Sequence, residues 1–199
     1  MHAKIFDIDG TLIQSASVDE GLYFEAVRSM LGDINIRPSL NDYDFVTDSG
    51  ILAQLLEENG FPIDAKLIVA IKSKFFRLLR SHIDRHGPFP EVPGAAMYLE
   101  ALSDSPIHKV ALATGGWRES AELKLQSAGM LKFGFPLATS DDAFDRAEIM
   151  RIALSSLGTT FDSVSYYGDG PWDRDACDKL GWNFVAVGSA FGGLTSYGD

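Results

Sequence analysis

Two aspartates, two positions apart, interrupt an apolar run near the start of the chain. The segment "KIFDIDGTL" (4–12) has the residues of a buried β-strand except for Asp7 and Asp9. Aspartate is depleted in strands, and an unpaired charge is costly to bury. Two aspartates in a surface turn would be the ordinary explanation, whereas carboxyl groups held at the end of a buried strand would be available for chemistry.

Further polar groups follow the later apolar runs of strand length. In an open parallel sheet, ligands bind beyond the carboxyl ends of the strands, so these groups would meet at one edge. They offer carboxylates, a hydroxyl group beside glycines and one cation, which together could hold a divalent cation and a phosphate. They are the Thr114-Gly115-Gly116 turn, Arg146, the Gly168-Asp169-Gly170 turn and Asp173.

Strands and helices alternate in the half of the chain where these groups lie. Such alternation with short connections is typical of βαβ units and of a parallel sheet covered on both faces. A strand over 4–8 brings the total to five, so we expect an α/β fold with a Rossmann-like, doubly wound parallel sheet. The other expected strands cover 109–114, 135–140, 163–169 and 183–188, and the expected helices cover 117–129, 146–158 and 171–181.

The part between the first two strands has a helical pattern and no convincing strand. The amphipathic stretches in it predict helices over 17–31, 50–60 and 65–84. The first of them opens with the spacing of a capping box at Ser17 and Glu20. We therefore predict a Rossmann-like catalytic core over 1–14 and 89–199, and an inserted α-helical cap over 15–88.

These motifs resemble those of the haloacid dehalogenase (HAD) superfamily of phosphohydrolases. The matching features are D-x-D-G-T at 7–11, Thr114, a basic residue that opens a helix, and G-D-x-x-x-D at 168–173, in that order. The helical insert looks like the small cap of phosphoglycolate-phosphatase-like and β-phosphoglucomutase-like members. The first and last motifs are specific together, and the two middle ones are weak alone. The resemblance implies an Mg²⁺-dependent phosphatase that hydrolyses a small phosphomonoester through an aspartyl-phosphate.

The resemblance also implies a role for each motif residue. Asp7 would be the nucleophile, and Asp9 the general acid that protonates the leaving oxygen and then the base that activates water. Alternate residues of a strand point the same way, so both carboxyl groups would reach one substrate. Thr114 and the amide of Gly115 would bind the phosphoryl oxygens. A turn threonine with no such role is the alternative for Thr114.

The same resemblance implies a metal site. Asp169 would complete an Mg²⁺ site with Asp7 and the backbone carbonyl of Asp9, since oxygen ligands suit Mg²⁺ bound jointly with a phosphate. Asp173 would be a direct ligand or a neighbour of the ligands. Its alternative role is that of an acidic residue favoured in the first turn of a helix.

Arg146 stands where the family usually has a lysine. A cation at the first position of a helix opposes the helix dipole, at a cost of about 0.3–1 kcal/mol, so local structure does not explain it. Neutralising Asp7 against the substrate phosphate does, and a guanidinium group can do so with two hydrogen bonds. The alternative is an arginine exposed at a helix end, with Lys132 in its place at the site.

Two other functions remain open at this stage. A sugar phosphomutase of the same superfamily would use the same residues and differ only in the acceptor of the phosphoryl group. A non-enzymatic aspartyl-phosphate signalling or binding scaffold would not need Asp9 and Asp169 beside Asp7. The cap residues that meet the substrate are also open, with Arg37, Thr47, Asp48, His82, His86 and the basic side chains of 65–85 as candidates.

The composition limits the partners. A formal charge of −11 over 199 residues argues against nucleic acids and anionic membrane surfaces. No apolar run reaches the ~20 residues of a membrane span, and no charged and apolar leader precedes the first strand. The single cysteine, Cys177, fits a reducing compartment. We expect a cytoplasmic enzyme that binds a small phosphorylated metabolite. Nothing in the sequence indicates its oligomeric state.

Overall fold

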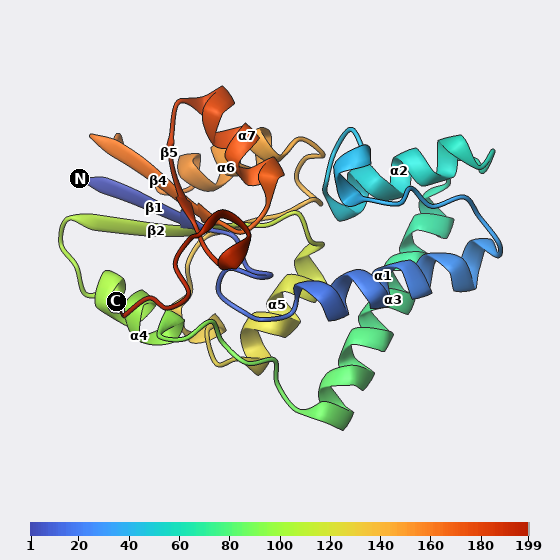
Figure 1. Ribbon diagram of the computed structural model, residues 1–199, viewed down its shortest axis with the longest axis horizontal. Coiled ribbons are helices and arrows are strands. Elements are labelled where there is room, and N and C mark those ends of the chain that lie inside the picture. The colour runs from blue at the N-terminus through green and yellow to red at the C-terminus, as the bar shows by residue number, and fades with distance from the viewer. Residues whose placement is uncertain (199) are drawn as a thin grey trace.

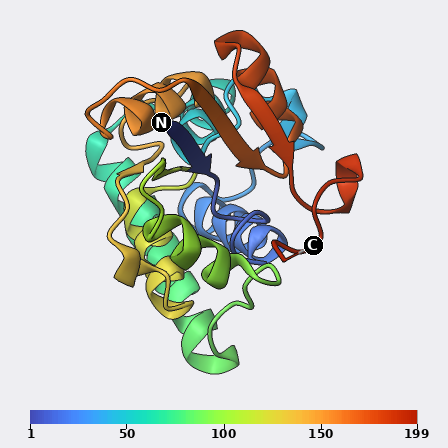
Figure 2. The same ribbon diagram turned by 90° about the vertical axis from the view of Figure 1, so that its left-hand side faces the viewer.

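A parallel sheet of five strands is the centre of the molecule. The computed structural model describes residues 1–198 and orders the strands β3-β2-β1-β4-β5. The strands are β1 (His2–Phe6), β2 (His108–Ala113), β3 (Leu137–Ala138), β4 (Ser163–Gly168) and β5 (Asn183–Ala186). Neighbouring strands are all parallel, and Figure 2 shows β1 (dark blue) and β4 (dark orange) running in the same direction. The predicted α/β fold with a parallel sheet is confirmed.

Two helices cover each face of this sheet (Figure 1). They are α4 (Ala95–Ser103) and α5 (Arg118–Ser127) on one face, and α6 (Arg146–Ser155) and α7 (Pro171–Leu180) on the other. Successive side chains of a strand point to opposite faces. Phe6 of β1 accordingly packs in the cluster with α4 and α5, and its neighbour Ile5 in the cluster with α6 and α7.

Three further helices form a separate layer beyond the carboxyl ends of the strands (Figure 1). They are α1 (Ala16–Leu31), α2 (Asp48–Glu58) and α3 (Ala65–His86). Their buried side chains form a hydrophobic cluster of their own, in which Phe75 of α3 packs with Tyr23 of α1 and Leu55 of α2. Trp117, from the loop before α5, also packs in that cluster, so one side chain of the catalytic core is buried inside the cap. The domain boundaries stay a prediction, and Asp199 lies outside the described residues.

The connection between β1 and α1 differs from the expectation. β1 ends at Phe6 and not at residue 8, because the amides of Leu12 and Ile13 donate to the carbonyl oxygen of Ile8 and curl the chain. Asp7 still pairs with the sheet through its amide, which donates to the carbonyl oxygen of Tyr167 at 2.9 Å, and Asp9 lies in the loop. The expectation that both carboxyl groups alternate along one strand is therefore wrong.

Other elements also differ from the prediction. α1 begins one residue before Ser17, with Ser15 at the N-cap, so the predicted capping box is wrong. β3 has two residues where 135–140 was predicted, because the amide of Thr139 donates to the Asp142 carboxylate and leaves the ladder. α4 was not predicted. Three short 3-10 helices connect the main elements: η1 (Leu40–Asp42), η2 (Leu131–Phe133) and η3 (Ser189–Phe191).

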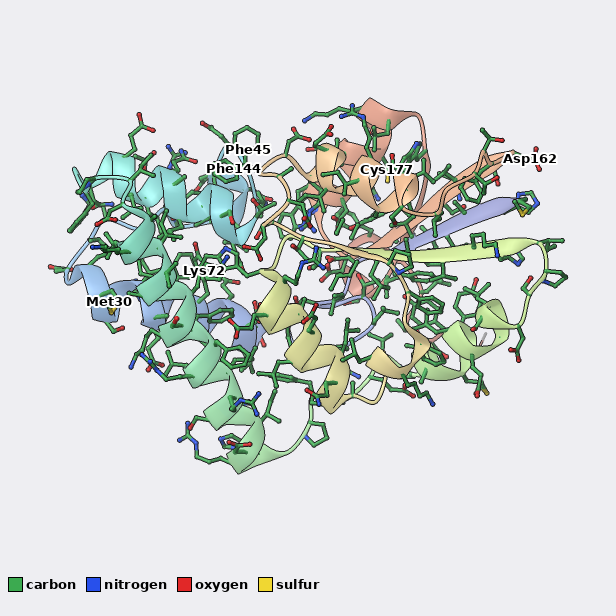
Figure 3. All side chains as sticks on the ribbon, turned by 180° about the vertical axis from the view of Figure 1, so that it is seen from behind. Met30, Phe45, Lys72, Phe144, Asp162 and Cys177 are labelled. Carbon is green, nitrogen blue, oxygen red and sulfur yellow. The ribbon has the colours of Figure 1, made fainter. Side chains whose placement is uncertain are left out.

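Several side chains join the cap to the core at its outer edge. Figure 3 shows Phe45 of the cap beside Phe144 of the loop before α6, and their ring centroids lie 6.4 Å apart. Lys72 of α3 forms an ion pair with Asp141 of the core. The cap therefore rests on the loops at the carboxyl edge of the sheet. None of the helices in residues 1–198 combines the length and the apolar character that crossing a bilayer requires.

Candidate active site

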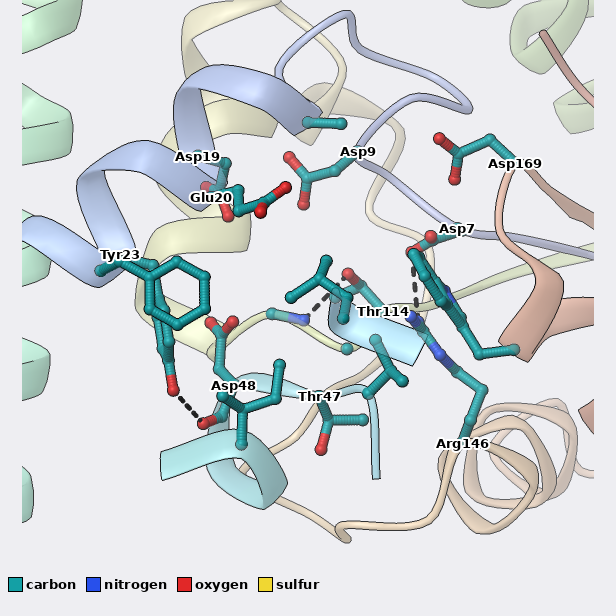
Figure 4. A pocket seen from close by; sticks show the side chains of 18 residues that line it. Asp7, Asp9, Asp19, Glu20, Tyr23, Thr47, Asp48, Thr114, Arg146 and Asp169 are labelled. Carbon is teal, nitrogen blue, oxygen red and sulfur yellow. Dashed lines mark hydrogen bonds and ion pairs between the residues drawn. The ribbon is translucent and has the colours of Figure 1, made fainter. Parts of the chain in front are cut away.

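A cavity of about 160 Å³ lies between the cap and the carboxyl edge of the sheet. Its lining includes the motif residues Asp7, Asp9, Thr114, Gly115, Arg146 and Asp169. Side chains of α1 and α2 line it from the other side (Figure 4). The structure therefore brings together residues that lie more than 160 positions apart in the sequence.

Asp7 is the most deeply buried of the carboxyl residues that line the cavity. Its side chain is 6% exposed, and its Oδ1 has no hydrogen-bond partner among residues 1–198. Arg146 Nη1 lies 3.5 Å away, the dashed line in Figure 4. Burial raises the pKa of Asp7 well above its ordinary value, and the Arg146 guanidinium opposes that shift. A buried carboxyl group in this state requires a ligand or a cation to satisfy it.

Two more aspartates stand beside Asp7. One carboxylate oxygen each of Asp7, Asp169 and Asp173 lies within 4.8 Å of the other two. Burial, followed by the charge of Asp173, raises the pKa of Asp169 to about 7. Such a set of crowded oxygen donors fits a hard divalent cation, and Mg²⁺ in particular. A bound cation would offset the repulsion between these carboxylates and favour their ionised forms.

Gly10 brings the loop that carries Asp9 up to this acidic cluster. Its φ is +74°, in the left-handed region, and a Cβ there would overlap the carboxyl group of Asp169. Only glycine therefore lets Asp169 approach the loop after β1 so closely. The predicted metal contact from the backbone carbonyl of Asp9 stays a prediction, supported by this approach.

Arg146 is held at the start of α6. Asp145 caps the helix by accepting from the amide of Glu148 at 3.1 Å, which puts Arg146 at the first helical position as predicted. Its side chain is 10% exposed, so it is not an arginine exposed at a helix end. Nε lies 3.4 Å from Asp173 Oδ1, and neither Nε nor Nη1 has a hydrogen-bond partner in the described part of the chain. Lys132, the alternative, is exposed and does not line the cavity.

The turn after β2 provides a hydroxyl group and amides. Thr114 is buried and lines the cavity, and its Oγ1 accepts from the amide of Gly116 at 3.2 Å, which leaves the hydroxyl hydrogen available. A Cβ on Gly115 would lie 2.8 Å from Arg146 Nη2. The glycine therefore leaves room for the guanidinium group.

Asp9 makes a set of contacts that the sequence did not predict. Both of its carboxylate oxygens lie 2.7 Å from Nζ of Lys124 on α5, and Ser15 Oγ donates to one of them. The same ammonium group donates to Asp19 of α1 at 2.7 Å. Burial alone would lower the pKa of Lys124, but the Asp19 and Asp9 carboxylates outweigh burial and raise it above its ordinary value. Asp9 therefore accepts from two donors, one on α5 and one at the start of α1.

Lys124 was missed because no motif marks it. One signal was present in the sequence: Lys124 occupies the same face of α5 as the buried Ala121 and Leu125, where a solvated lysine does not belong. The lysine side chain is fully buried, with its charge shared between Asp9 of the core and Asp19 of the cap. It therefore ties the first motif to the first cap helix.

The cap contributes acidic and apolar side chains to the cavity. Thr47 and Asp48 line it, as two of the predicted candidates, and Asp19, Glu20 and Tyr23 of α1 were not foreseen. Thr47 caps α2 by accepting from the amide of Gly50. Within residues 1–198, the other candidates do not line it: Arg37, His82, His86 and the basic side chains of α3. Arg37 instead forms an ion pair with Glu58.

Comparison with known proteins gives a family and a fold. A family model described as a haloacid dehalogenase-like hydrolase matches residues 1–181. A comparison with curated protein sequences found no match. Among solved structures, a hydrolase from Pseudomonas syringae is similar with a TM-score of 0.72 and 23% identity, over 94% of this chain and 84% of that one.

Two other solved structures are similar over nearly the whole chain. β-Phosphoglucomutase from Clostridium difficile has a TM-score of 0.72 and 19% identity, over 94% of this chain and 84% of that one. CbbY from Rhodobacter sphaeroides, in complex with phosphate, has a TM-score of 0.70 and 18% identity, over 99% and 88%. At these identities the likeness shows the fold. The family model covers nearly the whole of the chain and the motifs in the cavity, and the chain belongs to the haloacid dehalogenase-like hydrolases.

Proposed function

We propose that this hydrolase is a phosphatase that acts on a small phosphomonoester through an aspartyl-phosphate formed on Asp7. The carrying observation is the buried Oδ1 of Asp7, which has no hydrogen-bond partner among residues 1–198 and lies 3.5 Å from Arg146 Nη1 at one end of the cavity. A nucleophilic carboxylate and a cation so close together suit attack on an anionic phosphorus centre. Thr114 and the Gly115 amide stand beside them to bind the phosphoryl oxygens.

The reaction has two balanced steps. An Asp7 carboxylate oxygen attacks phosphorus, the bond from phosphorus to the ester oxygen breaks, and that oxygen takes its electron pair and a proton from Asp9. Water then attacks the phosphorus of the aspartyl-phosphate and gives a proton to Asp9, while the bond from phosphorus to Asp7 breaks. The products are the free alcohol and inorganic phosphate, and both aspartates return to their starting states.

Asp9 has to leave Lys124 to act as the acid. In the structure its carboxylate accepts from Lys124 and Ser15. For the first step, a proton and a turn of the side chain toward the leaving oxygen are needed. Binding of a substrate that draws the cap against the core would allow the Asp9 side chain to rotate in this way, because closure completes the site in capped enzymes.

Arg146 and the metal would balance the negative charge. We assign Arg146 to the substrate phosphate, since its Nη1 and Nε lack hydrogen-bond partners among the described residues. Mg²⁺ would be held by Asp7, Asp169 and the carbonyl oxygen of Asp9, with Asp173 as a further carboxylate beside Arg146. When bound, the ion supplies positive charge that screens the carboxylates from the phosphoryl oxygens. Arg146→Ala should then lower kcat/KM at least about tenfold.

The cap argues for a small substrate. It leaves a cavity of about 160 Å³, which suits a metabolite and not the side chain of a folded phosphoprotein. Among the similar structures, Rhodobacter CbbY was solved with phosphate and, as a variant, with xylulose-1,5-bisphosphate. A sugar phosphomutase remains the alternative, since the C. difficile neighbour is β-phosphoglucomutase. A non-enzymatic scaffold does not agree with membership of a hydrolase family.

The test is phosphate release from p-nitrophenyl phosphate with and without Mg²⁺. We expect turnover that requires Mg²⁺ and that Asp7→Asn abolishes, because an amide is not a nucleophile in this step. The matched control is Asp178→Asn, an exposed aspartate of α7, which should retain full activity. Undiminished turnover in Asp7→Asn would refute the assignment.

A further inference from the structure

The cavity has two halves of different chemistry (Figure 4). Asp7, Asp169 and Arg146 lie in the half at the edge of the sheet. The half that the cap forms has carboxyl groups and apolar side chains. Its carboxyl groups belong to Asp19, Glu20 and Asp48, and its aromatic rings to Tyr23 and Phe24.

The cap half has no exposed cation. In residues 1–198, no lysine, arginine or histidine lines it, and Lys124 lies fully buried against Asp19 and Asp9. Burial, followed by the charge of Asp19, raises the pKa of Asp48 well above its ordinary value. The negatively charged form of the Asp48 carboxyl group is therefore already disfavoured in this half of the cavity. An incoming anion would meet repulsion there, and a cation would relieve it.

The proposed reaction places the leaving alcohol in this half. Asp9 has to protonate the leaving oxygen, and Asp9 lies on the side of the cavity where Asp19 and Glu20 stand (Figure 4). The phosphoryl group lies at the other end, where Asp7 and Arg146 have atoms without hydrogen-bond partners among the described residues. The Arg146 nitrogens are donors on a cation, and they point to a bound anion at that end. The body of the alcohol therefore faces Glu20, Asp48 and Tyr23.

These side chains suit an ammonium group. Glu20 provides a carboxylate acceptor for its hydrogen bonds. A cation beside Asp48 would favour the carboxylate form of that group, whose Oδ2 already accepts from the amide of Trp117 at 2.9 Å. Tyr23 and Phe24 pack edge to face with ring centroids 5.2 Å apart, and aromatic rings attract cations. Tyr23 Oη is occupied with the carbonyl oxygen of Asp48 at 2.8 Å, so Tyr23 would meet the ligand through the part of its ring that lines the cavity.

We propose that the preferred substrate is the phosphate ester of a small alcohol that carries an ammonium group, and that the cap half excludes a second anionic group. This inference rests on the proposed phosphatase function and names its substrate class. It also separates the phosphatase from a mutase that works through a sugar bisphosphate, because a second phosphate would have to lie against Asp19, Glu20 and Asp48.

Three esters of nearly equal size test the proposal: 2-aminoethyl phosphate, 2-hydroxyethyl phosphate and phosphoglycolate. They place a cation, a neutral group and an anion at the same distance from phosphorus. We expect kcat/KM to fall in that order, by roughly tenfold at each step, as expected for one charge near several carboxylates at a partly solvated site. A preference for phosphoglycolate, or equal values for all three, would overturn the proposal.

Two variants test which side chains distinguish the amino ester from the hydroxy ester. Glu20→Gln and Asp48→Asn should each lower the ratio of kcat/KM for the amino ester over the hydroxy ester, by roughly threefold or more. Glu25→Gln is the matched control, since Glu25 is an exposed residue of the same helix and does not line the cavity. Glu20 is exposed, so Glu20→Gln should fold even where Asp48→Asn does not. Ratios unchanged in both folded variants would contradict the placement.

The p-nitrophenyl phosphate assay distinguishes a failure of the substrate inference from a failure of the proposed phosphatase function. Turnover of that ester, abolished by Asp7→Asn, together with no preference for the amino ester would leave the phosphatase standing and remove the inference. Absence of turnover with all four esters would remove both. The mutase alternative would be favoured by interconversion of a sugar phosphate without net phosphate release, and that outcome would also overturn the inference.

Discussion

A single lysine lies between the first motif and the cap. Lys124 contacts Asp9 and Asp19 at 2.7 Å each, and its side chain is fully buried. A buried charge of this kind is tolerated only with partners, and each partner is in turn tolerated only with the lysine. At the scale of residues, the ion pairs therefore couple the predicted proton-transfer group to the helix that closes the cavity.

Removing the ammonium group should destabilise the protein strongly. Lys124→Met leaves the buried Asp19 and the partly buried Asp9 without their cation, which costs about 3–5 kcal/mol of the free energy of unfolding. Chemical denaturation at pH 7 measures the loss. The control is Lys132→Met, at an exposed position, with an expected change below about 0.5 kcal/mol. Adding Asp19→Asn to Lys124→Met should restore part of the loss, and a single variant as stable as the wild type would contradict the burial argument.

Metal binding should depend steeply on pH. The pKa of Asp169 is raised on folding, from an ordinary value of 3.8 to about 7. This group therefore stabilises the metal-free fold below about pH 4, and the contribution is lost as the pH rises through 7. Mg²⁺ needs the ionised carboxylate, so Asp169 should make its affinity rise about tenfold per pH unit up to pH 7, and the raised pKa of Asp7 should steepen this dependence.

Titration calorimetry with Mg²⁺ at pH 6, 7 and 8 measures this dependence. Proton release on binding, seen as a heat that varies with the buffer, should be large at pH 6 and small at pH 8. Asp169→Asn should weaken Mg²⁺ binding and flatten the pH dependence that remains. An affinity that is equal at pH 6 and pH 8 in the wild type would argue against Asp169 as a ligand.

The sequence predicts motif residues well and their interactions poorly. Asp7, Thr114 and Arg146 could be found because each stands at a strand or helix end, and all three line one cavity. Lys124 could not be assigned a partner, because Asp9 and Asp19 reach it only through the tertiary arrangement of α5 against the loop after β1 and α1. Long-range ion pairs of this kind have no local pattern to mark them.

At the scale of elements, the start of α6 sets the position of Arg146. Asp145 accepts from the amide of Glu148 and so fixes the first turn of the helix. Asp64 does the same for α3 by accepting from the amide of Lys66 at 2.8 Å, at a helix end that does not line the cavity. The two aspartates make a matched pair, because each caps a helix and only one cap precedes a residue of the candidate site.

Asp145→Ala and Asp64→Ala should therefore differ in activity and not in stability. Each should cost about 1 kcal/mol of the free energy of unfolding, the usual loss for an N-cap. Only Asp145→Ala should lower kcat/KM for p-nitrophenyl phosphate, since a frayed first turn displaces the guanidinium group. Thermal unfolding and steady-state kinetics give both quantities. Equal kinetics for the two variants would mean that the cap does not position Arg146.

Element boundaries were predictable where a local signal sets them. α3 begins at Ala65 and α6 at Arg146, where the predicted helices over 65–84 and 146–158 begin, and an aspartate caps each of them. The end of β1 was misplaced because the apolar residues of "FDID" continue past the sheet, and the curl at Ile8 depends on amides several residues ahead. α4 has nine residues and was overlooked, since so short a run shows little helical periodicity.

At the scale of the whole molecule, one tryptophan of the core packs inside the hydrophobic cluster of the cap. Trp117 is buried in the cap cluster, with its ring centroid 5.4 Å from that of Tyr23 and 5.8 Å from that of Phe75. Its indole Nε1 donates to Ser49 Oγ at 2.8 Å. The insertion of the cap was predictable from the change of pattern between strands. Its anchoring by Trp117, a residue 29 positions beyond the insert, was not, because Trp117 fits the predicted helix over 117–129 equally well.

Trp117→Ala should loosen the cap on the core. A buried tryptophan cut to alanine costs about 3–5 kcal/mol, and here the cavity opens inside the cap cluster. We expect hydrogen exchange to accelerate in α1, α2 and α3 more than in β1, together with a lower kcat/KM, since Tyr23 and Asp48 lose their support. Trp182→Ala is the control, because Trp182 packs against the α6 and α7 face of the sheet, and its loss should be felt in the core first. Equal acceleration in cap and sheet after Trp117→Ala would mean that the two layers unfold as one unit, and closure of the cap over a substrate would then need another hinge.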